Sequence, residues 1–325
     1  MNIVCIGSSG FGLRCLQTCL ELSEVKVTGV VTAPRTFTIS YRPDGVTNVL
    51  HADIAGFAQA QSIPVLTLTR AMNEPGLLEG VLAWKPDAFV VAGWYHMIPK
   101  RWREHAPAYG LHASLLPDYS GGAPLVWAMI NGEAKAGITL FQMDDGVDSG
   151  PIAAQREEFI LPTDTIASLY ARIEEHGRDM LREALPLLAK GNLALRQQDD
   201  SKRRIMPQRS PEDGLIDWQQ GAIFLERFIR AQTRPYPGAF TTLDGKPLHV
   251  WQAKLGMQTN QGGQDAGQVC ALDGEYIVAC GTGYLTLKEV SYEQKNYSET
   301  QLAQLFGGGE QRLGILPDFL RNSEP

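Results

Sequence analysis

The first 22 residues, MNIVCIGSSGFGLRCLQTCLEL, predict the opening unit of an α/β fold. Residues 3–7 form an apolar, strand-like run, and the glycines at 7, 10 and 12 predict a turn. The residues from this turn to about Leu22 have the apolar spacing of a helix. A strand, a turn and a helix in this order are typical of a mainly parallel sheet.

The same alternation continues to about residue 150. Apolar runs predict strands at residues 25–32, 64–66, 88–93, 111–115 and 136–143. Helical patterns fall at residues 47–61, 77–84 and 123–131, and the Thr-, Arg- and Pro-rich residues 34–43 predict a loop. The sequence therefore predicts a Rossmann-like, mainly parallel sheet with helices on both faces.

The second half of the chain predicts a smaller, β-rich domain. One long helix is expected at residues 164–188 and another at 222–232, and Gly-rich turns then separate strand-like runs up to a helix at 298–306. We expect an open, OB-like barrel. The predicted divisions are a catalytic domain, an interdomain linker, the β-barrel-like domain and a tail, at residues 1–190, 191–210, 211–310 and 311–325.

Composition restricts the class of protein. Hydrophobic residues make up 44%, charged residues 20%, and the net charge is −7, which argues against a broad nucleic-acid-binding surface. Residues 201–325 hold 13 Lys and Arg against 14 Asp and Glu, so this part also lacks the positive charge that binds phosphate backbones. With no membrane-spanning run and no signal-peptide pattern, we expect a cytoplasmic protein that does not bind membranes or nucleic acid; a homodimer is compatible with the sequence.

The cysteines predict neither a disulfide framework nor a metal site. They are odd in number and have no Cys-x-x-Cys spacing. No group of His, Cys, Asp and Glu has metal-ligand spacing, so we expect a reaction without a metal. The five thiols, which we expect to be reduced, are Cys5, Cys15, Cys19, Cys270 and Cys280.

His112 and Asp148 are the leading candidates for acid–base chemistry. His112 falls near the end of a predicted parallel strand, where open α/β sheets bind their ligands, and Asp148 lies in a Gly-flanked loop after the next strand. A carboxylate that orients a histidine makes it a usable general acid or base. Asp144 and Asp145 are alternative partners, and His96 is either part of the same crevice or a surface residue.

Two other motifs differ from the known functional patterns that they resemble. The spacing Gly7-x-x-Gly10-x-Gly12 differs from the dinucleotide fingerprint, and no acidic residue ends the second strand, so we expect a tight turn near a ligand without phosphate specificity. Ser8, Ser9 and Ser114 do not lie in Gly-x-Ser-x-Gly, which argues against a hydrolase triad.

Two segments resemble the folate-dependent formyltransferases. The family pattern Asn-x-His-x-Ser-Leu-Leu-Pro, followed by x-Asp-x-Gly, corresponds here to GLHASLLP at 110–117 and VDSG at 147–150. IDW at 216–218 and PYPGAF at 235–240 are similar to the C-terminal domain of the methionyl-tRNA and sugar-nucleotide members. The resemblance covers about residues 1–310.

The resemblance implies that an amine attacks the formyl carbonyl of 10-formyltetrahydrofolate. His112 would stabilise the oxyanion or move the proton, and Asp148 would hold and charge-balance His112. The residues implied for the folate site are Val91, Gly93, Trp94, Tyr95, Met97, Ile98, Ser114, Leu115, Leu116, Pro117, Asp144, Asp145, Gly146 and Val147. Those implied for the substrate site are Ser9, Gly10, Phe11, Gly12, His96, Tyr119 and Gly122.

One family residue is missing. The resemblance aligns the family's asparagine, an amide donor to the oxyanion, with Gly110. Loss of one such donor costs on the order of a hundred- to a thousandfold in rate. Three alternatives follow: another residue or a water replaces the amide, the reaction is slower or different, or the protein binds folate without transferring the formyl group. Formyl hydrolysis belongs among them, because the hydrolase domain of formyltetrahydrofolate dehydrogenase also lacks this asparagine.

The acceptor is predicted to be small. The tRNA enzymes carry a basic loop after their second strand, whereas residues 34–43 here hold two arginines and no lysine. The general likeness favours the sugar-nucleotide N-formyltransferases, whose acceptor is an amino sugar on a nucleotide diphosphate. Formylation of methionyl-tRNA remains the alternative acceptor reaction.

Overall fold

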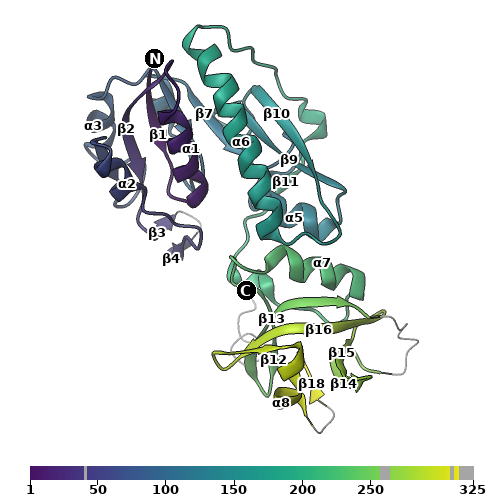
Figure 1. Cartoon of the computed structure of the whole chain (residues 1–325). Helices are drawn as coiled ribbons and strands as arrows, with labels where there is room; N and C mark the ends of the chain where they lie inside the picture. The colour runs from purple at the N-terminus through teal and green to yellow at the C-terminus, as the bar shows by residue number, and fades with distance from the viewer. Residues whose placement is uncertain (40–41, 257–263, 308–310, 315–325) are drawn as a thin grey trace. The chain divides into compact units, whose positions relative to one another are not determined.

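The computed structural model describes residues 1–39, 42–256, 264–307 and 311–314, and it divides the chain into two compact units (Figure 1). Unit 1 comprises Met1–Pro124, Lys135–Phe159 and Tyr170–Pro207. Unit 2 comprises Leu125–Ala134, Ile160–Leu169 and Gln208–Pro325. Two short segments of the predicted catalytic domain therefore belong to unit 2.

Unit 1 is built on a seven-stranded sheet of order β10-β9-β7-β6-β1-β2-β5. Its five strands from β7 to β5 are parallel, and β9 and β10 complete one edge in antiparallel pairing. The bounds are β1 Asn2–Ile6, β2 Lys26–Thr32, β5 Val65–Thr67, β6 Ala88–Val91, β7 Ala108–His112, β9 Lys135–Gln142 and β10 Ile152–Phe159. The predicted Rossmann-like, mainly parallel sheet is confirmed.

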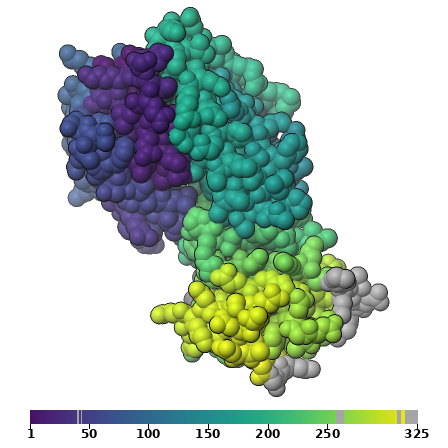
Figure 2. All heavy atoms as spheres, in the orientation of Figure 1, coloured from purple at the N-terminus to yellow at the C-terminus, as the bar shows by residue number. Residues whose placement is uncertain are grey.

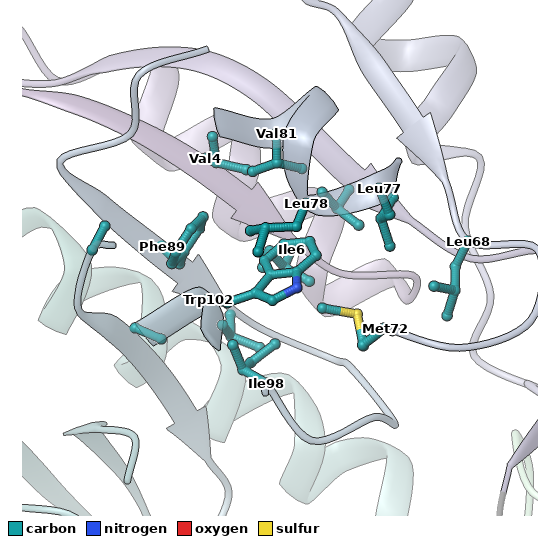
Figure 3. Close-up of a cluster of buried hydrophobic side chains, with 14 of the residues drawn as sticks. Val4, Ile6, Leu68, Met72, Leu77, Leu78, Val81, Phe89, Ile98 and Trp102 are labelled. Atoms are coloured by element: carbon teal, nitrogen blue, oxygen red, sulfur yellow. The ribbon is translucent and has the colours of Figure 1, made fainter. Parts of the chain in front are cut away.

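Helices cover both faces of this sheet. α1 (Gly10–Leu20) and α2 (Ile54–Ala60) lie on one face, where their side chains meet those of β1 and β6. The part of α6 (Ile166–Ala189) that belongs to unit 1 lies beside α1 (Figures 1 and 2), and Arg178 of α6 donates to Thr18 Oγ1 at 2.9 Å. α3 (Leu77–Leu82) and α4 (Lys100–Arg103) bury the opposite face around Trp102, which is 0% exposed (Figure 3).

Two local predictions in unit 1 are wrong. Residues 34–43, expected as a loop, contribute to a hairpin of β3 (Thr36–Ile39) and β4 (Arg42–Thr47). The helix expected at 47–61 begins only at Ile54, because Asp53 caps it by accepting from Gly56 N at 2.8 Å. Asn48, at the start of that predicted helix, is buried and uses its side chain to donate to Ser8 O at 3.2 Å.

The segment expected as a linker packs on unit 1. A parallel pair joins β11 (Ile205–Met206) to β8 (Ser120–Gly121), and Arg196 exchanges backbone hydrogen bonds with Ile152. A short 3₁₀ helix, η1 (Asp200–Lys202), lies between these contacts. Most side chains of residues 191–207 are exposed, while Gln198 and Arg203 are half-buried and bond to loops of unit 1.

Unit 2 has a curled antiparallel sheet of order β12-β13-β16-β15-β14-β18, with β17 paired to β16, which confirms the β-rich second domain. The strands are β12 Ala239–Leu243, β13 Lys246–Leu255, β14 Gln268–Leu272, β15 Glu275–Ala279, β16 Tyr284–Tyr292, β17 Lys295–Ser298 and β18 Gln311–Arg312. The helical elements are α5 Pro124–Asn131 (largely unit 2), η2 Pro211–Gly214, α7 Ala222–Gln232, η3 Glu299–Gln301 and α8 Leu302–Phe306. Trp218 of the IDW segment is buried and donates to Thr241 Oγ1 at 3.0 Å.

The first residues of the predicted tail form β18, which pairs with β14, while residues 315–325 lie outside the described part of the chain. Among the described helices, none is long and apolar enough to cross a bilayer.

Candidate functional site

The structure brings His112 and Asp148 together within unit 1. His112 is the last residue of β7, and Asp148 lies in the connection between β9 and β10. The Nδ1 atom of His112 is 3.5 Å from Oδ2 of Asp148, and their side chains are 12% and 20% exposed. The pair is therefore largely shielded from water but still reachable from the surface.

The loop after β7 contacts both members of this pair. His112 Nε2 lies 2.8 Å from the carbonyl oxygen of Tyr119 and must donate, because a carbonyl can only accept. Gly121 N donates to Asp148 Oδ2 at 2.8 Å. On the other side of the ring, Nδ1 faces the Asp148 carboxylate at 3.5 Å, a contact that is an ion pair whenever the imidazole is protonated.

Asp144 and Asp145 have other partners. Asp144 Oδ1 accepts from Gly146 N at 3.1 Å and from Ser149 Oγ at 2.6 Å, so it shapes the loop that carries Asp148. Asp145 is 69% exposed and pairs with Arg103, whose hydrogen bond lowers the pKa of the Asp145 carboxyl. Of the three candidate aspartates, Asp148 is the one that the structure places against His112.

A buried polar network fixes the loop after His112, and the sequence reasoning did not identify it. Thr139, which pairs with His112 across the strands and is 0% exposed, donates to Ser114 O at 2.6 Å and accepts from Leu116 N at 3.2 Å. Gln155 Nε2 donates to Leu116 O at 2.9 Å and to Thr139 Oγ1 at 2.8 Å. The available signal was a threonine between the apolar residues Ile138 and Leu140 in the middle of the strand.

Gly110 lies two residues before His112 on β7, so a side chain there would project from the same face of the sheet. Gly110 is buried, and a Cβ atom added to it would be 2.5 Å from Met143 Cε and 3.2 Å from Phe141 Cε1. The methyl group of Met143 therefore fills the space in which a side chain at position 110 would begin.

The segment implied to line the folate pocket has two kinds of residue. Val91 and Ile98 are 3% exposed and belong to the buried core around Trp102, in which Figure 3 labels Ile98; their part in folate binding stays a prediction. Tyr95 and Met97 are 38% and 57% exposed. Gly93 has φ +59° and receives a backbone hydrogen bond from Ser8 N at 3.1 Å, which fixes the turn between them.

The loop after β6 contains two buried polar ring atoms, one on Trp94 and one on His96. The centroids of the Trp94 and His96 rings lie 5.3 Å apart, and the centroid of the His96 ring lies 5.2 Å from that of Phe37 of β3. Burial lowers the pKa of His96 below its ordinary value. The buried Nε1 of Trp94 and Nε2 of His96 have no hydrogen-bond partner in the described part of the chain. Buried polar atoms are normally paired, so these two atoms fit a ligand with hydrogen-bonding edges.

The glycine turn uses its backbone groups internally. Ser9 caps α1 by accepting from Gly12 N at 3.3 Å, and Gly10 N donates to Leu50 O at 2.9 Å. The ring of Phe11 packs against Gly177 of α6, where an added Cβ would be 2.7 Å from its Cζ. None of these contacts involves the His112–Asp148 pair, and the role of this turn in substrate binding stays a prediction.

The remaining predicted residues surround the loop after β7. Tyr119 is buried beneath Arg204, whose guanidinium carbon lies 4.6 Å from the ring centroid, and Gly122 N donates to Met206 O at 3.0 Å. Leu116 is 3% exposed and packs with Phe141 and Ile152. Ser114, whose Oγ donates to Asp118 O at 2.7 Å, and half-buried Leu115 and Pro117 also lie in the loop after β7. Gly146 and Val147 are exposed in the connection between β9 and β10.

The cysteines are free, and burial raises the pKa of the Cys280 thiol to about 12. Across residues 1–39, 42–256, 264–307 and 311–314, no group of three or more His, Cys, Asp and Glu could hold a metal ion.

Comparison with known proteins identifies both parts of the chain. The family model described as formyl transferase matches residues 1–185, and the model described as formyl transferase, C-terminal domain, matches residues 209–304. A methionyl-tRNA formyltransferase from Citrifermentans bemidjiense is 37% identical over 301 residues, covering 91% of this chain and 90% of that protein.

Two solved structures share the fold at low sequence identity. The N-formyltransferase from Helicobacter canadensis, in complex with folinic acid and dTDP-3-aminofucose, has a TM-score of 0.62 at 16% identity, covering 88% of this chain and 98% of that one. HypX from Aquifex aeolicus, in complex with tetrahydrofolic acid, has a TM-score of 0.58 at 21% identity, covering 77% of this chain and 43% of that one.

Proposed function

The chain belongs to the formyl transferase family, and we propose that it moves the formyl group of 10-formyltetrahydrofolate to a primary amine by means of His112 and Asp148. Enzymes of this family use formyl-tetrahydrofolate as their donor. The observation that carries the proposal is the shielded contact between His112 Nδ1 and Asp148 Oδ2 at 3.5 Å. A paired histidine and carboxylate supply the proton transfers that formylation of an amine requires.

The residues of the 93–97 loop fit a folate. The pterin ring is flat and has polar edges, and this loop offers exposed Tyr95 and Met97 beside the unpartnered ring nitrogens of Trp94 and His96. We assign donor binding to this loop and to residues 144–147 before Asp148. The bound donor supplies an activated formyl carbonyl.

His112 stabilises negative charge and relays a proton in this proposal. A doubly protonated ring places positive charge beside the carbonyl oxygen under attack, and such preorganised charge acts strongly in a shielded site. The Asp148 carboxylate balances that charge, and it orders a water that takes the proton released by the attacking amine. The bond between the formyl carbon and the donor nitrogen then breaks, and a proton passes to that nitrogen as tetrahydrofolate leaves. The 3.5 Å separation leaves Nδ1 able to exchange Asp148 for the substrate or this water.

We infer that the acceptor is a small amine, with a nucleotide-linked amino sugar as the first candidate. The supporting observations are the net charge of −7 and the two-arginine segment 34–43, which contributes to the β3–β4 hairpin. Methionyl-tRNA is the second candidate, because relatives with that specificity in their names reach 37% identity over nine-tenths of both chains.

The test is release of tetrahydrofolate from 10-formyltetrahydrofolate by the purified protein, with dTDP-amino sugars, methionyl-tRNA and amine-free buffer as parallel arms. Amine-dependent release that disappears in His112→Gln supports formyl transfer. Release in buffer alone at the same rate makes the protein a hydrolase. Binding of the donor without release in any arm makes it a folate-binding protein. For the tRNA arm, affinity that falls steeply with salt identifies a phosphate-backbone interaction.

A further inference from the structure

Residues 196–207, which we call the strap, contact the loop that follows His112 and the loop that carries Asp148. Its backbone is fixed to the loop after β7, since Ser120 N donates to Arg204 O and Gly122 N donates to Met206 O, each at 3.0 Å. These contacts place the side chains of the strap beside the connection that carries Asp148.

Gln198 of the strap holds the backbone at Asp148. Its Nε2 donates to Asp148 O at 2.8 Å and to Gly150 O at 2.7 Å. Asp148 has φ +52°, in the left-handed region that a residue with a side chain occupies only where its surroundings hold it there. Two hydrogen bonds from one amide group supply such a restraint.

Arg203 joins Gln198 to the loops on either side. Its side chain is 14% exposed. Nη1 donates to Ser120 Oγ at 3.0 Å and to Val147 O at 3.4 Å. Nη2 donates to Gln198 Oε1 at 3.3 Å. The planar guanidinium can make these bonds at once, which an ammonium group at a single point cannot do. Arg203 therefore connects the Ser120 loop, the Val147 loop and the amide of Gln198.

We propose that Gln198 and Arg203 are positioning residues that hold the Asp148 carboxylate opposite His112, an inference that rests on the proposed function of this pair. Neither side chain contacts His112 in the described structure, so both act through the backbone of residues 147–150. A displacement of about 1 Å in such a group can lower a rate on the order of a hundredfold.

The first test is Gln198→Met, which keeps a side chain of similar length but removes the amide donors. We expect kcat to fall about ten- to a hundredfold, with KM for donor and acceptor changed by less than about twofold. Gln198→Glu, which keeps an acceptor for Arg203 but cannot donate to the two carbonyls, should lower kcat similarly. Lys202→Ala is the control, because this strap side chain is 75% exposed and pairs only with Asp199, at 3.4 Å, among the contacts recorded for it.

A double variant separates positioning from a general structural effect. In an Asp148→Asn background the group to be positioned is gone, so Gln198→Met should change the residual kcat by less than about twofold. The same ten- to hundredfold loss in that background would overturn the proposal, as would an unchanged kcat in the single variant.

Amide hydrogen exchange gives a readout that does not depend on activity. Gly121 N is bonded to the Asp148 carboxylate, whereas Ser120 N and Gly122 N are bonded to the strap backbone. Gln198→Met should accelerate exchange at Gly121 about tenfold and leave its two neighbours unchanged. Unchanged exchange at Gly121, or faster exchange at all three amides, would overturn the positioning role. If no amine releases tetrahydrofolate, the proposed function fails while this exchange result still decides whether Gln198 places Asp148.

Discussion

Replacing Gly110 by asparagine tests whether position 110 can supply a hydrogen bond to the reacting carbonyl. The new side chain would project from the same face of β7 as His112, and its Cβ would start 2.5 Å from Met143 Cε. Met143 is flexible and its methyl group is the far end of its side chain, so it can move aside. We expect this crowding to lower the free energy of unfolding by about 1–3 kcal/mol.

The matched control is Gly110→Ala, because alanine makes the same close approach to Met143 without an amide. One oxyanion donor contributes about 2.7–4 kcal/mol to the transition state, which corresponds to a hundred- to a thousandfold in rate. We therefore expect kcat of Gly110→Asn to exceed that of Gly110→Ala by about a hundredfold. Both variants add a Cβ atom at position 110, so comparing their kcat values removes the effect of this added atom on the rate.

The assay is tetrahydrofolate release at saturating donor and acceptor, with urea unfolding of each variant measured in parallel. A third variant combines Gly110→Asn with Met143→Ala, which removes the clashing methyl group. If crowding limits the asparagine, this double variant should be faster than Gly110→Asn alone.

Equal kcat values for the asparagine and alanine variants would refute the reasoning, since they would show that an amide at position 110 does not reach the reacting oxygen. A lower kcat for asparagine than for alanine would assign a different role to Gly110, namely to leave room for the acceptor beside His112.

Three further predictions concern other parts of the chain. Asp148→Asn keeps an acceptor for Gly121 N but removes the charge opposite His112, so kcat should fall about 10²- to 10⁴-fold, with unchanged donor affinity by fluorescence titration. Trp102→Ala should lower the free energy of unfolding in urea by about 3–5 kcal/mol, because Trp102 is 0% exposed in the core of Figure 3; a loss below 1 kcal/mol would contradict this packing. Burial lowers the pKa of His249 below 6.5, so the unfolded chain binds more protons and unit 2 should lose stability as pH falls through about 6.5; His249→Gln should flatten this dependence in thermal unfolding.

The architecture was predictable where each element follows from local periodicity. The apolar runs of β1 and β6 and the spacing of α7 gave the right elements because these segments are buried on regular faces. The polar strap has mostly exposed side chains, as its composition predicts, but that composition did not indicate that Gln198 and Arg203 bond to loops of unit 1. Polar composition does not reveal where a side chain finds its partner.

The two reactive side chains of the site could be predicted from the sequence, but the residues that hold them in place could not. His112 and Asp148 stand in recognisable motifs, whereas Thr139 and Gln155 hold the adjacent loop through contacts 25 and 39 residues apart in sequence. Gln198 is 50 residues from Asp148. Contacts at this range depend on strand pairing and loop path, which periodicity along one chain does not specify.

The direction of β9 explains why Asp148 needs such support. His112 is expected near the carboxyl end of a parallel strand, where open α/β sheets bind ligands, and Asp148 in the loop after the next strand. β9 instead runs antiparallel to β7, with Gln142 opposite Tyr109 and Thr139 opposite His112, so the end of β9 lies toward the start of β7. The chain from 143 to 151 must therefore fold back toward the end of β7 to bring Asp148 to His112. Within this loop Asp144 bonds to Gly146 N and Ser149 Oγ, and the strap adds hydrogen bonds at the left-handed residue Asp148 itself.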